Sequence, residues 1–270
     1  MKKLFASTLI LILVAITFKA CKKDDDDDDP TKVLLFSPSK DVSLGKEVQQ
    51  EIFNNPQTYP LLDSVRYASA YSYIRGLKDS ILNTGEIDYH DEFAWQVYII
   101  EDDATLNAFA TPGGYLYFYT GLIKYLQNED DLMGVMGHEI AHSDKRHSVQ
   151  QLQREYGVSL LLSIALGEQP GQAAQILTSL GTLKFSRNNE TEADLESVGY
   201  LAKTPYRCDG AATFFKKLSA SGQSGGPVFL STHPSPDDRV EKITAEAMSL
   251  GCDTNYYAPS SYQVFVNSLP

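Results

Sequence analysis

Apolar positions recur along most of the chain with the spacing of amphipathic helices. Residues 43–53 and 61–82 place apolar side chains three and four positions apart, which predicts two helices. The same spacing predicts later helices at 129–151, from 158, from about 171 past 194, and at 237–250.

Two shorter segments have the composition of β-strands. Residues 92–100 (EFAWQVYII) and 115–119 are rich in aromatic and β-branched residues, and Pro112-Gly113-Gly114 before the second segment has turn chemistry. The chain therefore predicts one α+β domain, mostly helical with a small β-sheet.

Composition narrows the possible functions. The chain has 270 residues, of which 43% are hydrophobic, enough to bury a core. The formal net charge of -12 argues against a nucleic-acid partner, because phosphate binding needs clustered Lys and Arg.

The N-terminus has the anatomy of an export signal. Lys2 and Lys3 precede a short apolar run at residues 4–18, and Ala20-Cys21 ends it. This resembles a bacterial lipoprotein signal, with residues 1–20 removed and Cys21 lipidated as the membrane anchor. An ordinary secretory signal is the alternative, although residues 18–20 form a poor cleavage site for it.

Six consecutive aspartates, residues 24–29, follow the lipidation site. They predict a solvated tether spanning residues 21–39. A charged stretch at this place also resembles the surface-export signal of some lipoproteins, so we expect an outer-membrane lipoprotein facing the periplasm or the cell surface.

Lipidation of Cys21 leaves Cys208 and Cys252 as a pair. In an exported protein such a pair favours a disulfide, and two separate buried thiols are the alternative.

The candidate chemistry lies in MGHEIAHSDKRH, residues 136–147. Residues four apart share one face of a helix, so His138 and His142 can bind one metal ion together. Glu139 is turned by about 100° and can reach a water on the metal as a general base. This is the H-E-x-x-H arrangement of zinc peptidases.

A third ligand is available in SRNNETEAD, residues 186–194. Glu190 and Asp194 are also four apart, and a catalytic zinc takes three protein ligands with one open position. We therefore predict one zinc ion per chain, bound by His138, His142 and Glu190. The Asp194 carboxylate would accept a hydrogen bond from the N–H of one ligand histidine, on the ring nitrogen that does not bind zinc.

These motifs occur in the order typical of a known family. NAFATPGGYLYFYTGLI, GHEIAHSDKRH, FSRNNETEAD and STHPSPDDR together resemble the HtpX-like zinc metallopeptidases, over about residues 40–250. The resemblance implies a zincin-like domain at 40–250, followed by a C-terminal tail at 251–270, and the same three zinc ligands. This chain looks like the soluble, exported branch, because it lacks the transmembrane helices of HtpX itself.

The resemblance implies a zinc endopeptidase that hydrolyses unfolded or misassembled envelope or extracellular proteins in protein quality control. Glu139 would assist the attack of zinc-bound water. His233 and Arg187 are candidate donors to the developing oxyanion, and Arg239 is a candidate support or, equally, a surface ion-pair partner. Relatives carry a histidine in a similar His-Pro setting that acts as a switch, so His233 could instead close the site.

Two further expectations concern polypeptide substrates. Tyr115, Leu116 and Tyr117 should lie on an exposed edge strand beside the zinc, where an extended peptide can pair. The alternative to an enzyme is a chaperone-like lipoprotein that binds client polypeptides with little proteolysis.

Overall fold

The structure is a computed structural model that describes residues 36–169, 171–182, 184–220, 228–233, 238–255 and 261–270. The predicted signal peptide, Cys21 and most of the tether lie outside these residues. The first half of the described chain comprises α1 (Pro38–Asn54), α2 (Ala68–Leu82), β1 (Gln96–Ile100), β2 (Ala108–Thr111), β3 (Tyr115–Tyr119), α3 (Thr120–Tyr125) and α4 (Glu129–Asp144). The second half comprises α5 (His147–Tyr156), α6 (Val158–Ala165), α7 (Gln172–Leu180), α8 (Arg187–Leu201), α9 (Gly210–Ala220), α10 (Val228–Thr232), α11 (Arg239–Leu250) and α12 (Ser261–Asn267).

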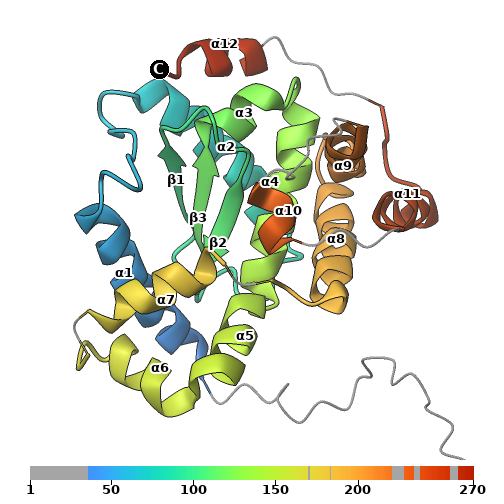
Figure 1. Cartoon of the computed structure of the whole chain (residues 1–270). Coiled ribbons are helices and arrows are strands. Elements are labelled where there is room, and N and C mark those ends of the chain that lie inside the picture. Colours follow the sequence, from blue (N-terminus) through green and yellow to red (C-terminus); the bar gives the residue numbers. More distant parts are fainter. Residues whose placement is uncertain (1–35, 170, 183, 221–227, 234–237, 256–260) are drawn as a thin grey trace, which may run out of the picture.

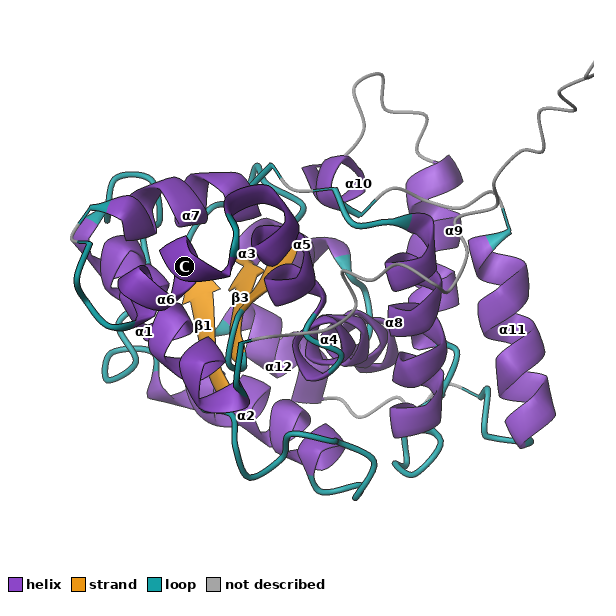
Figure 2. Cartoon of the chain, turned by 90° about the horizontal axis from the view of Figure 1, so that it is seen from below, coloured by secondary structure: helices purple, strands orange, loops and turns teal. Residues whose placement is uncertain are grey.

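The mostly helical α+β prediction is confirmed, and the sheet has three strands in the order β1-β3-β2. Two hydrophobic clusters fill the two sides of this sheet. Tyr115 and Tyr117 face a cluster formed with α1, α5, α6 and α7, whereas Leu116 and Phe118 face the larger cluster with α2, α4, α8 and α9. The sheet thus lies between the two helical groups (Figures 1 and 2).

The prediction that residues 115–119 form an edge strand is wrong. β3 is the central strand: β1 pairs with it in parallel and β2 pairs with it in antiparallel register. The turn at Gly113 and Gly114 causes this arrangement, because their carbonyl groups accept hydrogen bonds from Ala94 and Gln96 and so align β1 beside β3. The free edge of the sheet that lies next to α4 therefore belongs to β2.

The helix predicted at 129–151 is two helices. α4 ends at Asp144, and Arg146 has a left-handed backbone with φ of 59° before α5 begins. Non-glycine residues rarely adopt this conformation. The buried Arg146 guanidinium is held by both carboxylate oxygens of Asp41, at 2.6 and 2.9 Å, and this ion pair fixes the bend between the helices.

Other boundaries also differ from the sequence predictions. α1 begins at Pro38 rather than residue 43, since proline is well suited to a first helical turn. The helix predicted from 171 past 194 is split into α7 and α8. Within the expected tail, α12 packs on the core through the buried Tyr262 and Phe265.

The structure joins Cys208 and Cys252 in a disulfide, with their Cα atoms 6.2 Å apart. This links the start of α9 to the end of α11. In the part of the chain that the structure describes, no helix is both long and apolar enough to cross a bilayer.

Two glycines let neighbouring helices approach α4 closely. A Cβ on Gly134 would lie 2.1 Å from the backbone nitrogen of Ala211, and one on Gly137 would lie 2.4 Å from the Ser197 hydroxyl oxygen. We expect Gly134→Ala to lower the free energy of unfolding by about 1–3 kcal/mol through overpacking.

Gly76, in the exposed middle of α2, provides a matched control. A Cβ there meets no atom within 4 Å, so Gly76→Ala should raise stability by about 0.5–1 kcal/mol. Urea denaturation of both variants measures the two changes, and equal effects would contradict the close contact between α4 and α9.

Candidate metal centre

Two buried helices carry the central side chains. α4 presents His138, Glu139 and His142, and α8 packs against it and presents Glu190. Each helix begins with a capping side chain, since Asn128 accepts from the N–H of Asp131 and Ser186 accepts from the N–H of Asn189. The two helices pack side by side, and α10 lies in front of them in the view of Figure 1.

Four side chains converge: His138, His142, Glu190 and His233, with one ligand atom of each within 4.8 Å of the others. The Nε2 atoms of His138 and His142 are 3.0 Å apart, and the Glu190 carboxylate lies 3.4 Å from His142 and 3.6 Å from His138. His233 Nδ1 lies 3.1 Å from Glu190. All four are at most 1% exposed.

This donor set fits zinc, which binds imidazole nitrogens and a carboxylate. Burial holds the pKa values of His138 and His142 well below the usual histidine range, so both rings are neutral and can bind a metal. Burial alone would raise the pKa of Glu190, but His233 and His142 hold it well below its usual value. The third ligand is therefore ionised.

Glu139 lies beside this cluster, with His233 Nε2 3.6 Å from its carboxylate. It is 1% exposed, and neither carboxylate oxygen has a hydrogen-bond partner among the described residues. Burial raises the pKa of Glu139 to about 7, against the opposing effect of His233. An unpartnered carboxylate with such a pKa is suited to exchange a proton with a water at neutral pH.

The neighbouring helices hold the ligands in place. Asp194 lies 2.9 Å from His138 Nδ1, which leaves Nε2 of this ring toward the cluster. Arg239 of α11 binds Asp194 through two contacts of 2.6 and 2.8 Å, and it also lies 3.0 Å from Glu190. Arg239 is 1% exposed, so it supports the site rather than forming a surface ion pair.

His147 contacts the cluster. Its Nδ1 lies 2.9 Å from Nδ1 of His142, and its Nε2 lies 3.2 Å from Glu192. A single straight helix over residues 129–151 would turn His147 away from the metal, because it lies nine residues, or two and a half turns, after His138. The bend at Arg146 instead returns His147 to His142. Detecting it would have required the pairing of Arg146 with Asp41, which lies 105 positions away.

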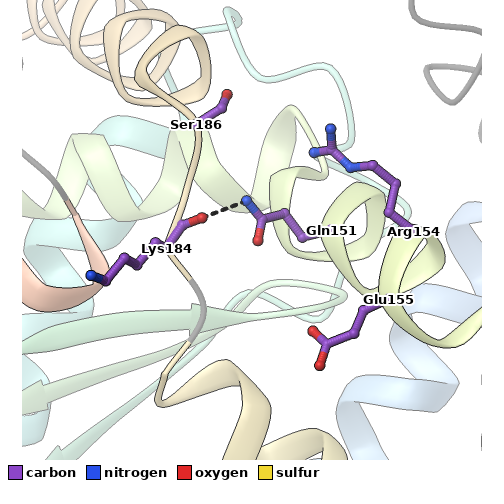
Figure 3. Close-up of a pocket in the computed structure, with 5 residues that line it drawn as sticks. All are labelled: Gln151, Arg154, Glu155, Lys184 and Ser186. Carbon is purple, nitrogen blue, oxygen red and sulfur yellow. Dashed lines mark hydrogen bonds between the residues drawn. The ribbon is translucent and has the colours of Figure 1, made fainter.

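The segment before α8 closes the cluster from another side. Phe185 stacks on the His142 ring, with centroids 4.1 Å apart. Figure 3 shows Gln151 of α5 reaching the Lys184 carbonyl, a hydrogen bond of 2.7 Å that anchors this segment beside a polar hollow. Arg187, one of the two predicted oxyanion donors, is exposed at the start of α8, whereas the other, His233, is buried within the cluster.

The fold and the site together define a zincin-like metalloendopeptidase domain. The model of peptidase family M48 matches residues 78–247, and the chain belongs to this family, whose members use zinc. The chain is therefore a relative of known metallopeptidases over most of its described length.

Three curated proteins show the extent of the similarity. Mitochondrial metalloendopeptidase OMA1 of Schizosaccharomyces pombe is 34% identical over 157 residues, 56% of this chain and 46% of that protein. OMA1 of Saccharomyces cerevisiae is 26% identical over 213 residues, 75% of this chain and 60% of that protein. The beta-barrel assembly-enhancing protease of Escherichia coli K12 is 34% identical over 159 residues, which cover 53% of this chain and 32% of that protein. The chain thus spans between a third and three fifths of these relatives.

Proposed function

We propose that the protein is a zinc endopeptidase that cleaves unfolded or misassembled polypeptides outside the cytoplasm. The observation that carries the proposal is the convergence of His138, His142 and Glu190, with the unpartnered carboxylate of Glu139 beside them. Two histidines and one carboxylate are the ligands of a catalytic rather than a structural zinc site.

Zinc, when bound, would lower the pKa of a water toward 7 and polarise the peptide carbonyl. Glu139 takes the proton from the attacking water and later delivers it to the leaving amine. His233 lies 3.6 Å from Glu139 through Nε2. Donation from its ring to the carbonyl oxygen as negative charge develops is the alternative to the closing role proposed for it below. Asp194 and Arg239 keep His138 and Glu190 in position throughout.

Substrate backbone is proposed to pair with the free edge of β2. The Ala110 carbonyl on this strand faces α5, where the Ser148 hydroxyl approaches it at 3.4 Å, and the Ala110 N–H is among the groups that lower the pKa of Glu139. An extended peptide added to β2 would therefore run past the catalytic carboxylate. α10 covers part of this edge, since Phe229 donates to the Leu106 carbonyl, so binding requires α10 to move.

The export signal and the acidic tether support a lipoprotein anchored through Cys21 on the outer membrane, facing the periplasm or the cell surface. The name of the E. coli relative, a beta-barrel assembly-enhancing protease, supports envelope proteins as substrates. A chaperone-like lipoprotein that binds client polypeptides with little proteolysis is the alternative. Incubation with a permanently unfolded polypeptide separates them: fragments support the peptidase, and intact bound polypeptide supports the chaperone.

His233 is proposed to close the resting site. Burial alone would lower the pKa of His233, but the carboxylates of Glu190 and Glu139 raise it. The ring offers a fourth ligand atom beside those of His138, His142 and Glu190, so it would fill the position that a catalytic zinc keeps open. We expect His233→Ala to raise the cleavage rate of an unfolded polypeptide several-fold, with zinc content unchanged. A lower rate would assign His233 to oxyanion stabilisation instead, and an unchanged rate would exclude it from the chemistry.

A further inference from the structure

A pocket of about 240 Å³ opens between the segment after β1, the β2–β3 hairpin and α7. Its lining comes from the β2 edge, the end of α7 and Thr232, the residue directly before His233. Pockets for drug-sized ligands measure roughly 300–1,000 Å³, so this one suits a single side chain of a longer ligand. A peptide paired with β2 would pass its mouth.

The walls of the pocket are apolar. Phe109 and Tyr119 contribute rings with centroids 6.3 Å apart, and Leu177 and Leu180 of α7 form the opposite side. Such walls bury the methylene stem of a long side chain, and the ring faces attract a cation.

The polar part of the lining includes two side chains that offer acceptor oxygens, Asn107 and Asp102. Asn107 is 6% exposed, and its Oδ1 has no hydrogen-bond partner among the described residues. Asp102 accepts from the N–H of Ala104 at 2.9 Å and from the Thr105 hydroxyl at 2.6 Å, which leaves its carboxylate able to accept further bonds. None of the described residues that line the pocket is Lys or Arg.

We propose that this pocket is a substrate subsite that takes a lysine or arginine side chain next to the scissile bond. The apolar walls would hold the stem, and Asp102 and Asn107 would accept hydrogen bonds from the charged end. This inference rests on the proposed peptidase function and adds the side-chain preference.

The test uses the zinc-loaded full chain and two peptides that differ only in Lys or Met at one position. A digest of random peptides, mapped by mass spectrometry, first identifies the position relative to the cut where basic residues are enriched. Asp102→Asn should then lower the ratio of kcat/KM for the Lys peptide over the Met peptide about tenfold, because a charge-assisted hydrogen bond is lost.

Asp103→Asn is the matched control. Asp103 is adjacent but exposed, and it pairs with Lys124 at 2.6 Å outside the pocket. Thr58→Lys, at an exposed position of the lining, provides a second variant that keeps Asp102 and places a competing ammonium group there. The ratio of kcat/KM for the Lys peptide over the Met peptide should be unchanged in Asp103→Asn and reduced in Thr58→Lys.

A binding measurement separates this inference from the proposed function. With Glu139→Gln protein, fluorescence anisotropy of the labelled peptides should show tighter binding of the Lys peptide than of the Met peptide. This difference should disappear when Asp102→Asn is added. Wild-type protein that cuts peptides without basic enrichment at any position, or equal loss in Asp102→Asn and Asp103→Asn, would overturn the subsite. Absence of all cleavage would overturn the peptidase, and the binding ratio would still decide the subsite.

Discussion

Glu139→Gln should abolish peptide hydrolysis while zinc content and folding remain those of the wild type. The amide has almost the same shape as the carboxylate but cannot accept a proton from water. General-base catalysis contributes about 10²–10⁴-fold, so we expect the cleavage rate to fall by at least that factor. The measurement is the initial rate of cleavage of an unfolded polypeptide, at equal zinc content for both proteins.

Glu155→Gln is the control for this change, because Glu155 is an exposed glutamate on α5 that lies outside the cluster. Its rate should match the wild type. Retention of more than about a tenth of wild-type activity by Glu139→Gln would contradict the general-base role, since a loss of at least a hundredfold is expected.

Loss of a metal ligand should remove the zinc itself. We expect elemental analysis to find one zinc per chain in the wild type and almost none in His142→Ala or Glu190→Ala after dialysis, because each substitution leaves only two of the three predicted protein ligands. The apo protein should also unfold at a lower temperature, since a ligand that binds only the folded state stabilises it.

A graded series sharpens this test. Asp194→Asn keeps all three ligands but weakens the support of His138, so zinc affinity should fall by about 10–100-fold. His90→Ala removes an exposed histidine that pairs only with Asp91 in the described structure, and its zinc content should be unchanged. Full zinc retention by His142→Ala would refute the ligand set.

The cluster could be derived from sequence because its spacing is local. His138 and His142 share a helical face, as do Glu190 and Asp194, and the structure brings the two pairs together. The hairpin from Ala108 to Tyr119 could also be predicted from neighbouring residues, because Gly113 and Gly114 mark its turn. The zinc assignment needed the two motifs in combination, because neither spacing alone defines a three-ligand site.

Features that depend on distant contacts could not be derived in this way. The central place of β3 depends on its pairing with β1, and hydrophobic alternation does not identify a strand's neighbours. The bend at Arg146 depends on Asp41, far away in the chain, and it determines where His147 points. Arg239 likewise reaches the site only because α11 packs against α8.

Zinc-dependent peptide hydrolysis is tested most directly by mass spectrometry of an unfolded polypeptide incubated with the purified protein. The incubation is done after chelation and again after addition of one equivalent of zinc. We expect fragments from internal cuts when the wild-type protein holds zinc. We expect no fragments after chelation, and none with zinc-loaded Glu139→Gln. Intact polypeptide in the presence of zinc-loaded wild-type and His233→Ala protein would contradict zinc-dependent peptide hydrolysis.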